Sequence, residues 1–276
     1  MSTLMAIWLG LVQGVTEFIP VSSSGHLVIL GRAEENFGLY AIVMFHFGTL
    51  MAIVAYYYRD LRSVLGGGVR LAGAAGRHLA GRGSLGSFLE SDAAARLALL
   101  IIAGSIPTGI IGLLLRDLAS QASNPGRAKL VGAAFIVTAV LIYTCDRLPT
   151  GFKGIGGARF FDAILMGIFQ GAAVMPGLSR SGLTIFSGVL RGMERRDAAR
   201  LSFLMAVPAM IAATGLELFD GAPPGQAGPA LIGAIVSFVS GYISIALLIR
   251  LLASRRLRYF AGYLVALGIF TLIWLN

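Results

Sequence analysis

Two short polar stretches interrupt apolar segments of the sequence, and the first of them carries a carboxylate. Gln13 and Glu17 are four residues apart, and Pro20, three serines and His26 follow them. Residues four apart share one face of a helix, so Gln13 and Glu17 are predicted to project together. A carboxylate among apolar residues is costly unless it is paired, hydrated or bound to a cation. We therefore interpret Glu17 as functional; a glutamate satisfied by neighbouring helices is the structural alternative.

The three serines stand where a new helix is predicted to begin after the proline. Serine is a favoured N-cap residue, so one of Ser22, Ser23 and Ser24 could be purely structural, but three in succession exceed what a cap requires. We expect Ser23 and His26 to be catalytic, and Ser22 and Ser24 to contact the substrate. A packing role is the structural alternative for the histidine. The nucleophile stays open between His26 and a serine, for which either His26 or Glu17 would be the base.

The second polar stretch combines an arginine with hydroxyl groups at the start of another predicted helix. Gly177 permits a tight turn with exposed amides, and the helix is predicted to begin at about Ser181. Helix N-termini present free amide groups and a positive dipole end, which favour anions. Arg180 adds a permanent charge and a planar donor group that suits phosphate oxygens; an ion pair with Glu17 is its structural alternative. The hydroxyl groups expected to contact the same anion belong to Ser179, Ser181 and Thr184.

These groups together suit a phosphate or diphosphate group. Arg180 and the backbone amides would hold its oxygens and stabilise the charge that develops on phosphorus. Glu17, with Gln13 on the same helix face, would activate the nucleophile or bind a divalent cation, which we expect to be Mg²⁺ or Ca²⁺. Apolar helices around the site would supply a flank for a lipid tail.

The elements that position these residues are predicted to be membrane helices. Of the 276 residues, 57% are hydrophobic and 13% are charged, whereas soluble domains average about 25% charged residues. Six segments have close to the roughly 20 apolar residues that a spanning helix needs. These predicted spans are about 39–58, 93–115, 129–145, 200–219, 229–252 and 259–275. The single cysteine, Cys145, excludes an intrachain disulfide and a cysteine-cluster metal site.

Two further apolar segments, 2–32 and 161–190, are broken near the middle by proline, glycine and serine. Each half is too short to cross a bilayer, so each segment is predicted to be a re-entrant helix pair. The two segments resemble each other, since Gly10-x-x-Gln-Gly is repeated at Gly167-x-x-Gln-Gly. Three predicted spans follow each segment, so the second copy would be inverted relative to the first. We expect one all-α membrane domain, 1–276, with repeats of about 1–145 and 160–276.

The net charge of +9 does not indicate nucleic-acid binding, because the basic residues fall in loops between apolar spans. If neither broken segment crosses the bilayer, the most basic loops all fall on one side. The positive-inside rule assigns that side to the cytoplasm and both termini to the outside. Within the first basic loop, residues 63–90 are rich in glycine and arginine. They are predicted to be a flexible connector attracted to anionic lipid headgroups.

At both polar stretches the sequence resembles the undecaprenyl-diphosphate phosphatase family, also called the bacitracin-resistance family. The first family signature is glutamate or glutamine, three residues, glutamate, and then Phe-x-Pro-Val-Ser-Ser-x-Gly-His, which residues 13–26 match. The second is Pro-Gly-x-Ser-Arg-Ser-x-x-Thr, which residues 176–184 match. The likeness in length and span pattern covers essentially the whole chain. Gln13 takes the amide alternative, so a mechanism that needs two carboxylates there is in doubt.

The resemblance implies hydrolysis of undecaprenyl diphosphate to the monophosphate and free phosphate, which recycles the lipid carrier for peptidoglycan and other envelope polymers. It also implies that Glu17, His26 and Arg180 are essential and that a divalent cation supports activity. The site is expected to open to the outer, periplasmic face of the cytoplasmic (inner) membrane. His46 is a weaker candidate, because some relatives have glutamine in that span.

A transporter of anions or lipid carriers is the alternative function, since the same inverted architecture serves alternating access. Turnover of a polyprenyl diphosphate by purified protein without a gradient would separate the two. The sequence does not determine the oligomeric state, for which a homodimer is one option.

Overall fold

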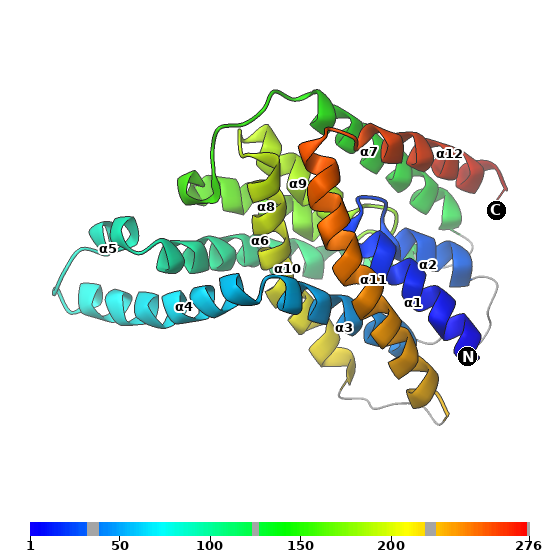
Figure 1. Cartoon of the computed structure of the whole chain (residues 1–276), viewed down its shortest axis with the longest axis horizontal. Helices are drawn as coiled ribbons and strands as arrows, with labels where there is room; N and C mark the ends of the chain where they lie inside the picture. Colours follow the sequence, from blue (N-terminus) through cyan, green and yellow to red (C-terminus); the bar gives the residue numbers. More distant parts are fainter. Residues whose placement is uncertain (32–38, 123–126, 219–224, 275–276) are drawn as a thin grey trace.

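The computed structural model describes residues 1–31, 39–122, 127–218 and 225–274, and these residues form helices and no β-strand. Figure 1 shows the arrangement of the helices. Their bounds are α1 (Thr3–Phe18), α2 (Ser23–Gly31), α3 (Leu39–Tyr56), α4 (Tyr58–Leu79), α5 (Leu85–Ser91), α6 (Ala93–Ala122), α7 (Ala128–Arg147), α8 (Phe160–Ala172), α9 (Arg180–Leu190), α10 (Arg195–Leu218), α11 (Ala227–Ala253) and α12 (Arg258–Trp274). The connections between α2 and α3, between α6 and α7, and between α10 and α11 lie wholly or partly outside the described residues.

Among the residues that the structure describes, five helices are long and apolar enough to cross a membrane, namely α3, α6, α7, α10 and α11. They correspond to five of the six predicted spans, and the polytopic all-α class is confirmed. The sixth predicted span, 259–275, corresponds to α12, which is apolar but has 17 residues. Residues 275–276 lie outside the described part of the chain.

Both predicted breaks are present, and each separates two helices too short to span. In the first, α1 ends at Phe18 and α2 begins at Ser23; the intervening turn places Ser22 at φ 67, a left-handed conformation. In the second, α8 ends at Ala172 and α9 begins at Arg180, one residue before the predicted start. Gly177 has φ +93, and a Cβ there would lie 2.5 Å from the Val131 carbonyl oxygen, so the turn requires glycine.

The first helix of each broken segment packs through glycine against a helix from the other half of the chain. A Cβ on Gly10 of α1 would lie 2.4 Å from the carbonyl oxygen of Gly233 in α11. A Cβ on Gly167 of α8 would lie 2.0 Å from the carbonyl oxygen of Gly104 in α6. Small residues allow such close backbone approach in membrane proteins, so these contacts fix how deeply each break lies in the bundle.

Matching hydrogen bonds reinforce the two close crossings. Ser237 Oγ of α11 donates to the Gly10 carbonyl oxygen at 2.8 Å, and Thr108 Oγ1 of α6 donates to the Gly167 carbonyl oxygen at 3.0 Å. Next to the first break, the ring of Phe18 meets the ring of Phe203 in α10 edge-on, with centroids 5.4 Å apart. Both rings are fully buried. The chain around the breaks is therefore held by packing on both sides.

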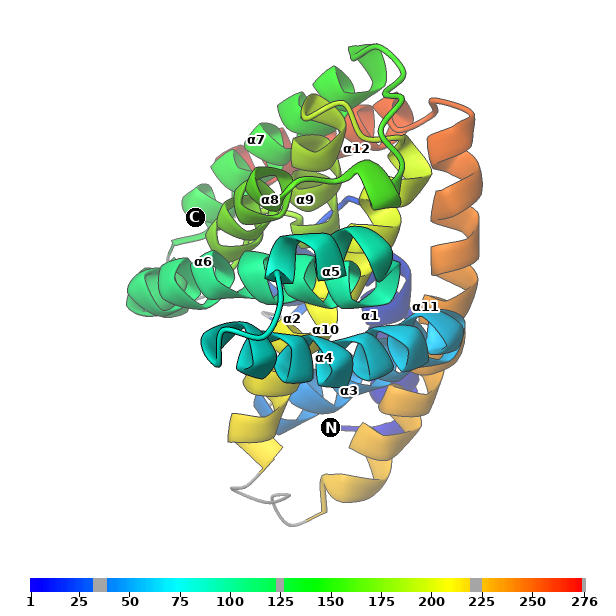
Figure 2. The same cartoon turned by 90° about the vertical axis from the view of Figure 1, so that its left-hand side faces the viewer.

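The prediction of a flexible connector at 63–90 was wrong, because α4 and α5 occupy most of it. Both helices lie beside the N-terminal part of α6 (Figure 2). Gly67 packs so closely on α6 that a Cβ would lie 2.4 Å from the carbonyl carbon of Ala94. Arg70 pairs with Asp92 at 2.6 Å, and Asp60 pairs with Arg200 of α10. In the sequence, the glycines of this segment suggest flexibility. In the structure, Gly67 instead allows α4 to pack closely against α6.

Candidate active site

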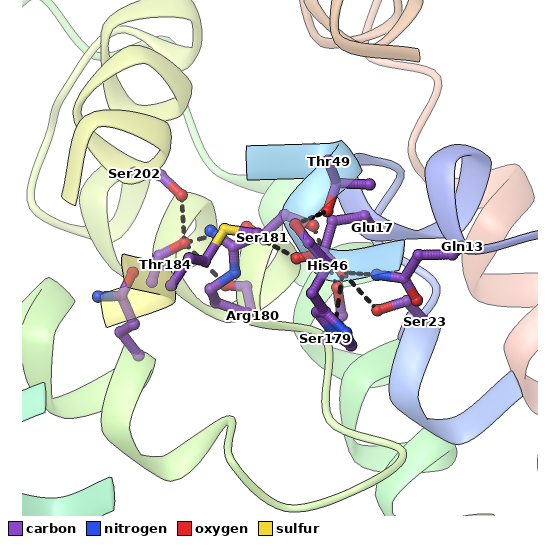
Figure 3. Close-up of polar contacts among 12 residues, drawn as sticks. Gln13, Glu17, Ser23, His46, Thr49, Ser179, Arg180, Ser181, Thr184 and Ser202 are labelled. Carbon is purple, nitrogen blue, oxygen red and sulfur yellow. Dashed lines mark hydrogen bonds and ion pairs between the residues drawn. The ribbon is translucent and has the colours of Figure 1, made fainter. Parts of the chain in front are cut away.

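The Glu17 carboxylate is the centre of the polar network between the two breaks (Figure 3). Gln13 Nε2 donates to Glu17 Oε2 at 2.8 Å, and Ser23 Oγ donates to the same oxygen at 2.6 Å. Arg180 Nη2 donates to Glu17 Oε1 and forms an ion pair with it. Glu17 is 8% exposed. A buried carboxylate of this kind is stable only with such partners, and they come from both broken segments.

Arg180 retains donor capacity beyond its ion pair. Its side chain is 16% exposed, and its Nη1 atom is buried with no hydrogen-bond partner among the described residues. Buried guanidinium donors are normally satisfied, so an unpartnered one beside a cavity indicates a place for an anion. The structural alternative, an ion pair with Glu17, is present, but it uses only part of the guanidinium group.

The serines of the first break have separate tasks. Ser22 Oγ accepts from the Gly25 amide at 3.3 Å and lies 3.4 Å from Ser24 Oγ, so Ser22 supports the start of α2. The Ser23 hydroxyl instead donates to Glu17. A serine hydroxyl bonded to a carboxylate can lose its proton to that carboxylate as it attacks an electrophile.

In the second break, most hydroxyl groups stabilise the turn and the start of α9. Ser179 caps the helix, since its Oγ accepts from the Gly182 amide at 3.1 Å. Ser181 Oγ lies 3.2 Å from Ser179 Oγ, and Thr184 Oγ1 lies 2.5 Å from Ser202 Oγ. Ser181 and Thr184 are fully buried.

A cavity of about 730 Å³ opens beside this network. Six of the predicted site residues line it, namely Glu17, Ser22, Ser23, Ser24, Ser179 and Arg180. Gln13, Gly177, Ser181, Thr184 and His26 are not among the lining residues. Gln13 nevertheless contacts Glu17 directly. Both breaks thus contribute to a single pocket.

Two cavity walls were not predicted from the sequence. The wall from α6 consists of Ser105, Thr108, Gly109, Gly112, Leu113 and Arg116, and the wall from α10 of Pro208, Ala209, Met210, Ala212 and Ala213. Both walls are mostly small or apolar, which suits a hydrocarbon tail. The available sequence signal was a proline inside each span, Pro107 and Pro208, since helix breakers at membrane depth occur beside cavities and buried contacts.

His26 lies to the side of the network. Its Nδ1 is 2.7 Å from the Ser22 carbonyl oxygen, and its Nε2 is 2.6 Å from the Tyr263 hydroxyl. Its ring stacks on Tyr263 with centroids 5.7 Å apart. Both ring nitrogens are therefore engaged away from Glu17 and Arg180. The histidine that does line the cavity is His46 of α3. The catalytic role of His26 stays a prediction.

The described residues do not by themselves form a divalent-cation site. No group of three or more His, Cys, Asp or Glu side chains among them could hold a metal ion. Glu17, the predicted ligand, already accepts from Arg180, Gln13 and Ser23. Hard cations need several free oxygen ligands, and the Glu17 carboxylate in this arrangement does not offer them. The predicted Mg²⁺ or Ca²⁺ requirement stays a prediction.

Comparison of the sequence with known proteins identifies a matching family. The family described as bacitracin resistance protein BacA matches residues 6–270. The chain is 39% identical to an undecaprenyl-diphosphatase of Methanosphaera stadtmanae, with 98% of this chain and 97% of that protein covered. It is 37% identical to an undecaprenyl-diphosphatase of Desulfosudis oleivorans, with 100% of this chain and 99% of that protein covered. It is 36% identical to one of Alkaliphilus metalliredigens, covering 97% of each.

Proposed function

The chain belongs to the family of bacitracin resistance protein BacA, and on that premise we propose that it hydrolyses undecaprenyl diphosphate. The products are undecaprenyl phosphate and inorganic phosphate. The reaction recycles the lipid carrier for cell-wall synthesis, and the name of the family associates it with resistance to bacitracin. The relatives named undecaprenyl-diphosphatase, each matched over nearly the whole chain, support this activity.

One observation carries the proposal: Arg180 and Ser23, from different breaks, both bind the carboxylate of Glu17. This arrangement holds a hydroxyl, its base and a permanent positive charge at one end of a cavity with apolar walls. A diphosphate headgroup fits the polar end, and a polyprenyl tail fits the walls of α6 and α10. The free Nη1 donor of Arg180 would bind a phosphate oxygen.

The first chemical step follows from these contacts. Ser23 Oγ attacks the terminal phosphorus of the substrate, and its proton passes to Glu17 Oε2, 2.6 Å away. The bond between that phosphorus and the bridging oxygen breaks, and the lipid monophosphate leaves with the electron pair. Arg180 stabilises the charge that develops on the phosphoryl oxygens. Gln13 holds the Glu17 carboxylate toward Ser23. The serine alternative for the nucleophile is the one that this geometry supports.

The proposal includes the full membrane arrangement. Six spans, with α12 as the sixth, and two re-entrant pairs form an inverted repeat, supported by the matching glycine contacts of α1 with α11 and of α8 with α6. The basic loops face the cytoplasm, and the cavity opens toward the periplasmic face of the inner membrane. A homodimer stays a prediction, to be measured by the mass of the purified protein.

Phosphate release from farnesyl or undecaprenyl diphosphate by purified protein in detergent tests the activity. Arg180→Ala is expected to lower the rate by at least about 10³-fold. It should also lower the unfolding temperature, because the buried Glu17 carboxylate loses its charge partner, so the rate is measured at a temperature where the variant remains folded. Full activity in this variant would remove Arg180 from the site. Titration with EDTA and then with Mg²⁺ or Ca²⁺ in the same assay measures the predicted cation requirement.

The transporter alternative is addressed by the same experiment, because detergent-solubilised protein experiences no gradient. Turnover there identifies a phosphatase. Absence of turnover, together with lipid translocation in vesicles, would favour the transporter. The names of the relatives favour the phosphatase.

A further inference from the structure

His46 faces the Glu17 carboxylate from a third element, α3. Its Nε2 atom lies 3.9 Å from Glu17 Oε2, its side chain is 30% exposed, and it lines the cavity. Its Nδ1 atom lies 2.9 Å from the Ile42 carbonyl oxygen. A carbonyl oxygen only accepts hydrogen bonds, so Nδ1 carries a proton and the neutral ring presents a lone pair at Nε2. The main chain here is tied as well, since Thr49 Oγ1 donates to the His46 carbonyl oxygen at 2.9 Å.

Glu17 Oε2 and His46 Nε2 are thus two acceptors that face each other. Their separation of 3.9 Å is too long for a direct hydrogen bond. Glu17 is already neutralised by Arg180, so it needs no second cation. A single water donates two hydrogen bonds of about 2.8 Å, which together span roughly 4–4.5 Å. The separation of 3.9 Å lies just below this span, so one water molecule can donate to both acceptors through slightly short or bent hydrogen bonds.

Hydrolysis of a phosphorylated Ser23 needs such a water. In the described state, Glu17 Oε2 accepts from both Gln13 and Ser23. Once Ser23 Oγ is bonded to phosphorus, it carries no hydrogen to donate to Glu17. Glu17 Oε2 carries the proton taken from Ser23 at that stage; as it returns this proton to Oγ, it becomes an acceptor for a water beside the phosphorus that the water must attack.

The geometry assigns His46 as the second acceptor that, with Glu17, positions the hydrolytic water; this rests on the proposed function. The water oxygen forms a bond to phosphorus as the bond from phosphorus to Ser23 Oγ breaks. Glu17 returns to Oγ the proton taken in the first step, and its Oε2 atom accepts a proton from the water. That proton passes on to an oxygen of the departing phosphate, which also keeps the hydrogen that His46 Nε2 held. The phosphate leaves with both hydrogens of the water, so atoms and charge balance and Glu17 is again a carboxylate beside the Ser23 hydroxyl.

The test compares His46→Leu, which removes the acceptor at similar size, with His46→Gln, whose side-chain oxygen can accept a hydrogen bond. The substrate is farnesyl diphosphate labelled in its terminal phosphate. In His46→Leu we expect a rapid burst of one farnesyl phosphate per enzyme and labelled enzyme that accumulates. Steady-state phosphate release should fall about 10²-fold, the cost of misplacing a reacting group. His46→Gln should stay within about fivefold of the wild type, since it keeps an acceptor.

His78→Leu is the matched control, because His78 lies at the exposed end of α4 and does not line the cavity. If the variant were merely less stable, the burst amplitude and the steady-state rate would fall together. A full burst with a slow steady-state rate therefore distinguishes a positioning role from a folding defect. Wild-type turnover in His46→Leu, loss of its burst, or equal defects in Leu and Gln variants would each overturn the inference. An inactive wild type would instead overturn the proposed function.

Discussion

The first break, between α1 and α2, and the second, between α8 and α9, use similar residues for packing and different residues for chemistry. Gly10 and Gly167 both bring a helix against the backbone of a helix from the other half. The paired glutamines differ, because Gln13 binds Glu17 whereas Gln170 donates to Thr108 and the Met205 carbonyl oxygen. The carboxylate comes only from the first break.

The second break contributes the guanidinium group instead, and its own serines mostly stabilise the turn. The turns also differ, since the first has Ser22 at φ 67 and the second has Gly177 at φ +93. A repeated backbone therefore carries an unequal set of functional groups, and neither break is a site alone. The following variants test that division of tasks.

The largest effect is expected from exchanging the charged pair, Glu17→Arg with Arg180→Glu. The exchange preserves the ion pair but moves the carboxylate away from Ser23, so phosphate release should fall by about 10⁴-fold. Steady-state kinetics in detergent measure the effect, with the unfolding temperature as a check on folding. Recovery of activity in the double variant, relative to either single variant, would show that the chemistry is not tied to one break.

Ser23→Ala should have the next largest effect, about 10³-fold, because it removes the attacking hydroxyl. Ser181→Ala, the comparison in the second break, should lower activity no more than about 10-fold, since the Ser181 hydroxyl pairs with Ser179 and does not line the cavity. Labelled substrate should mark the Ser181→Ala enzyme and leave Ser23→Ala unlabelled. Equal losses would contradict the division of tasks among the serines.

The packing similarity of the two breaks predicts equal sensitivity to added volume. Gly10→Ala and Gly167→Ala should each lower the free energy of unfolding by about 1–3 kcal/mol, because the new methyl group meets backbone atoms. Gly262→Ala in α12 is the control, since a Cβ there has no neighbour within 4 Å. Thermal unfolding in detergent measures all three. A tolerant Gly167 beside a sensitive Gly10 would show that the two crossings are not equivalent.

The smallest effect concerns the α4–α5 hairpin, which lies between α3 and α6. Arg70 and the amides of Ala95 and Ala94 lower the pKa of Asp92 to about 2. A lowered pKa stabilises the fold above the usual carboxyl pKa of about 4, and this contribution is lost as the pH falls toward 2. Asp92→Asn should remove a small part of the pH dependence of unfolding. A larger loss of unfolding free energy in Asp92→Asn than in Gly10→Ala would contradict this ranking.

The residues of the site could be predicted where local spacing determines the contact. Gln13 and Glu17 lie on one helix face and are hydrogen-bonded. The pairing of Glu17 with Arg180 was predicted as an alternative to anion binding, and the structure has the pair together with a free donor. Both breaks were located from proline, glycine and serine.

The positions of the two histidines depend on tertiary packing that spacing does not reveal. His26 belongs to a recognisable signature. Its Nε2 atom is nevertheless hydrogen-bonded to the hydroxyl of Tyr263 in α12, which lies far along the chain. His46 stands in an apolar span without a motif and contacts Glu17 because α3 packs beside α1. The walls from α6 and α10 carry no chemical signature. The glycines of α4 suggested a flexible segment, although Gly67 permits contact with α6.

The crossed packing of α1 on α11 and of α8 on α6 has a consequence for biogenesis. Helix α1 contacts a partner that is translated much later, since α11 begins at Ala227. The serine and carboxylate therefore enter the bilayer long before their final neighbours exist. Helix α1 cannot take up its final packing until α11 has been translated, so a chain truncated before α11 inserts helices without acquiring a working centre.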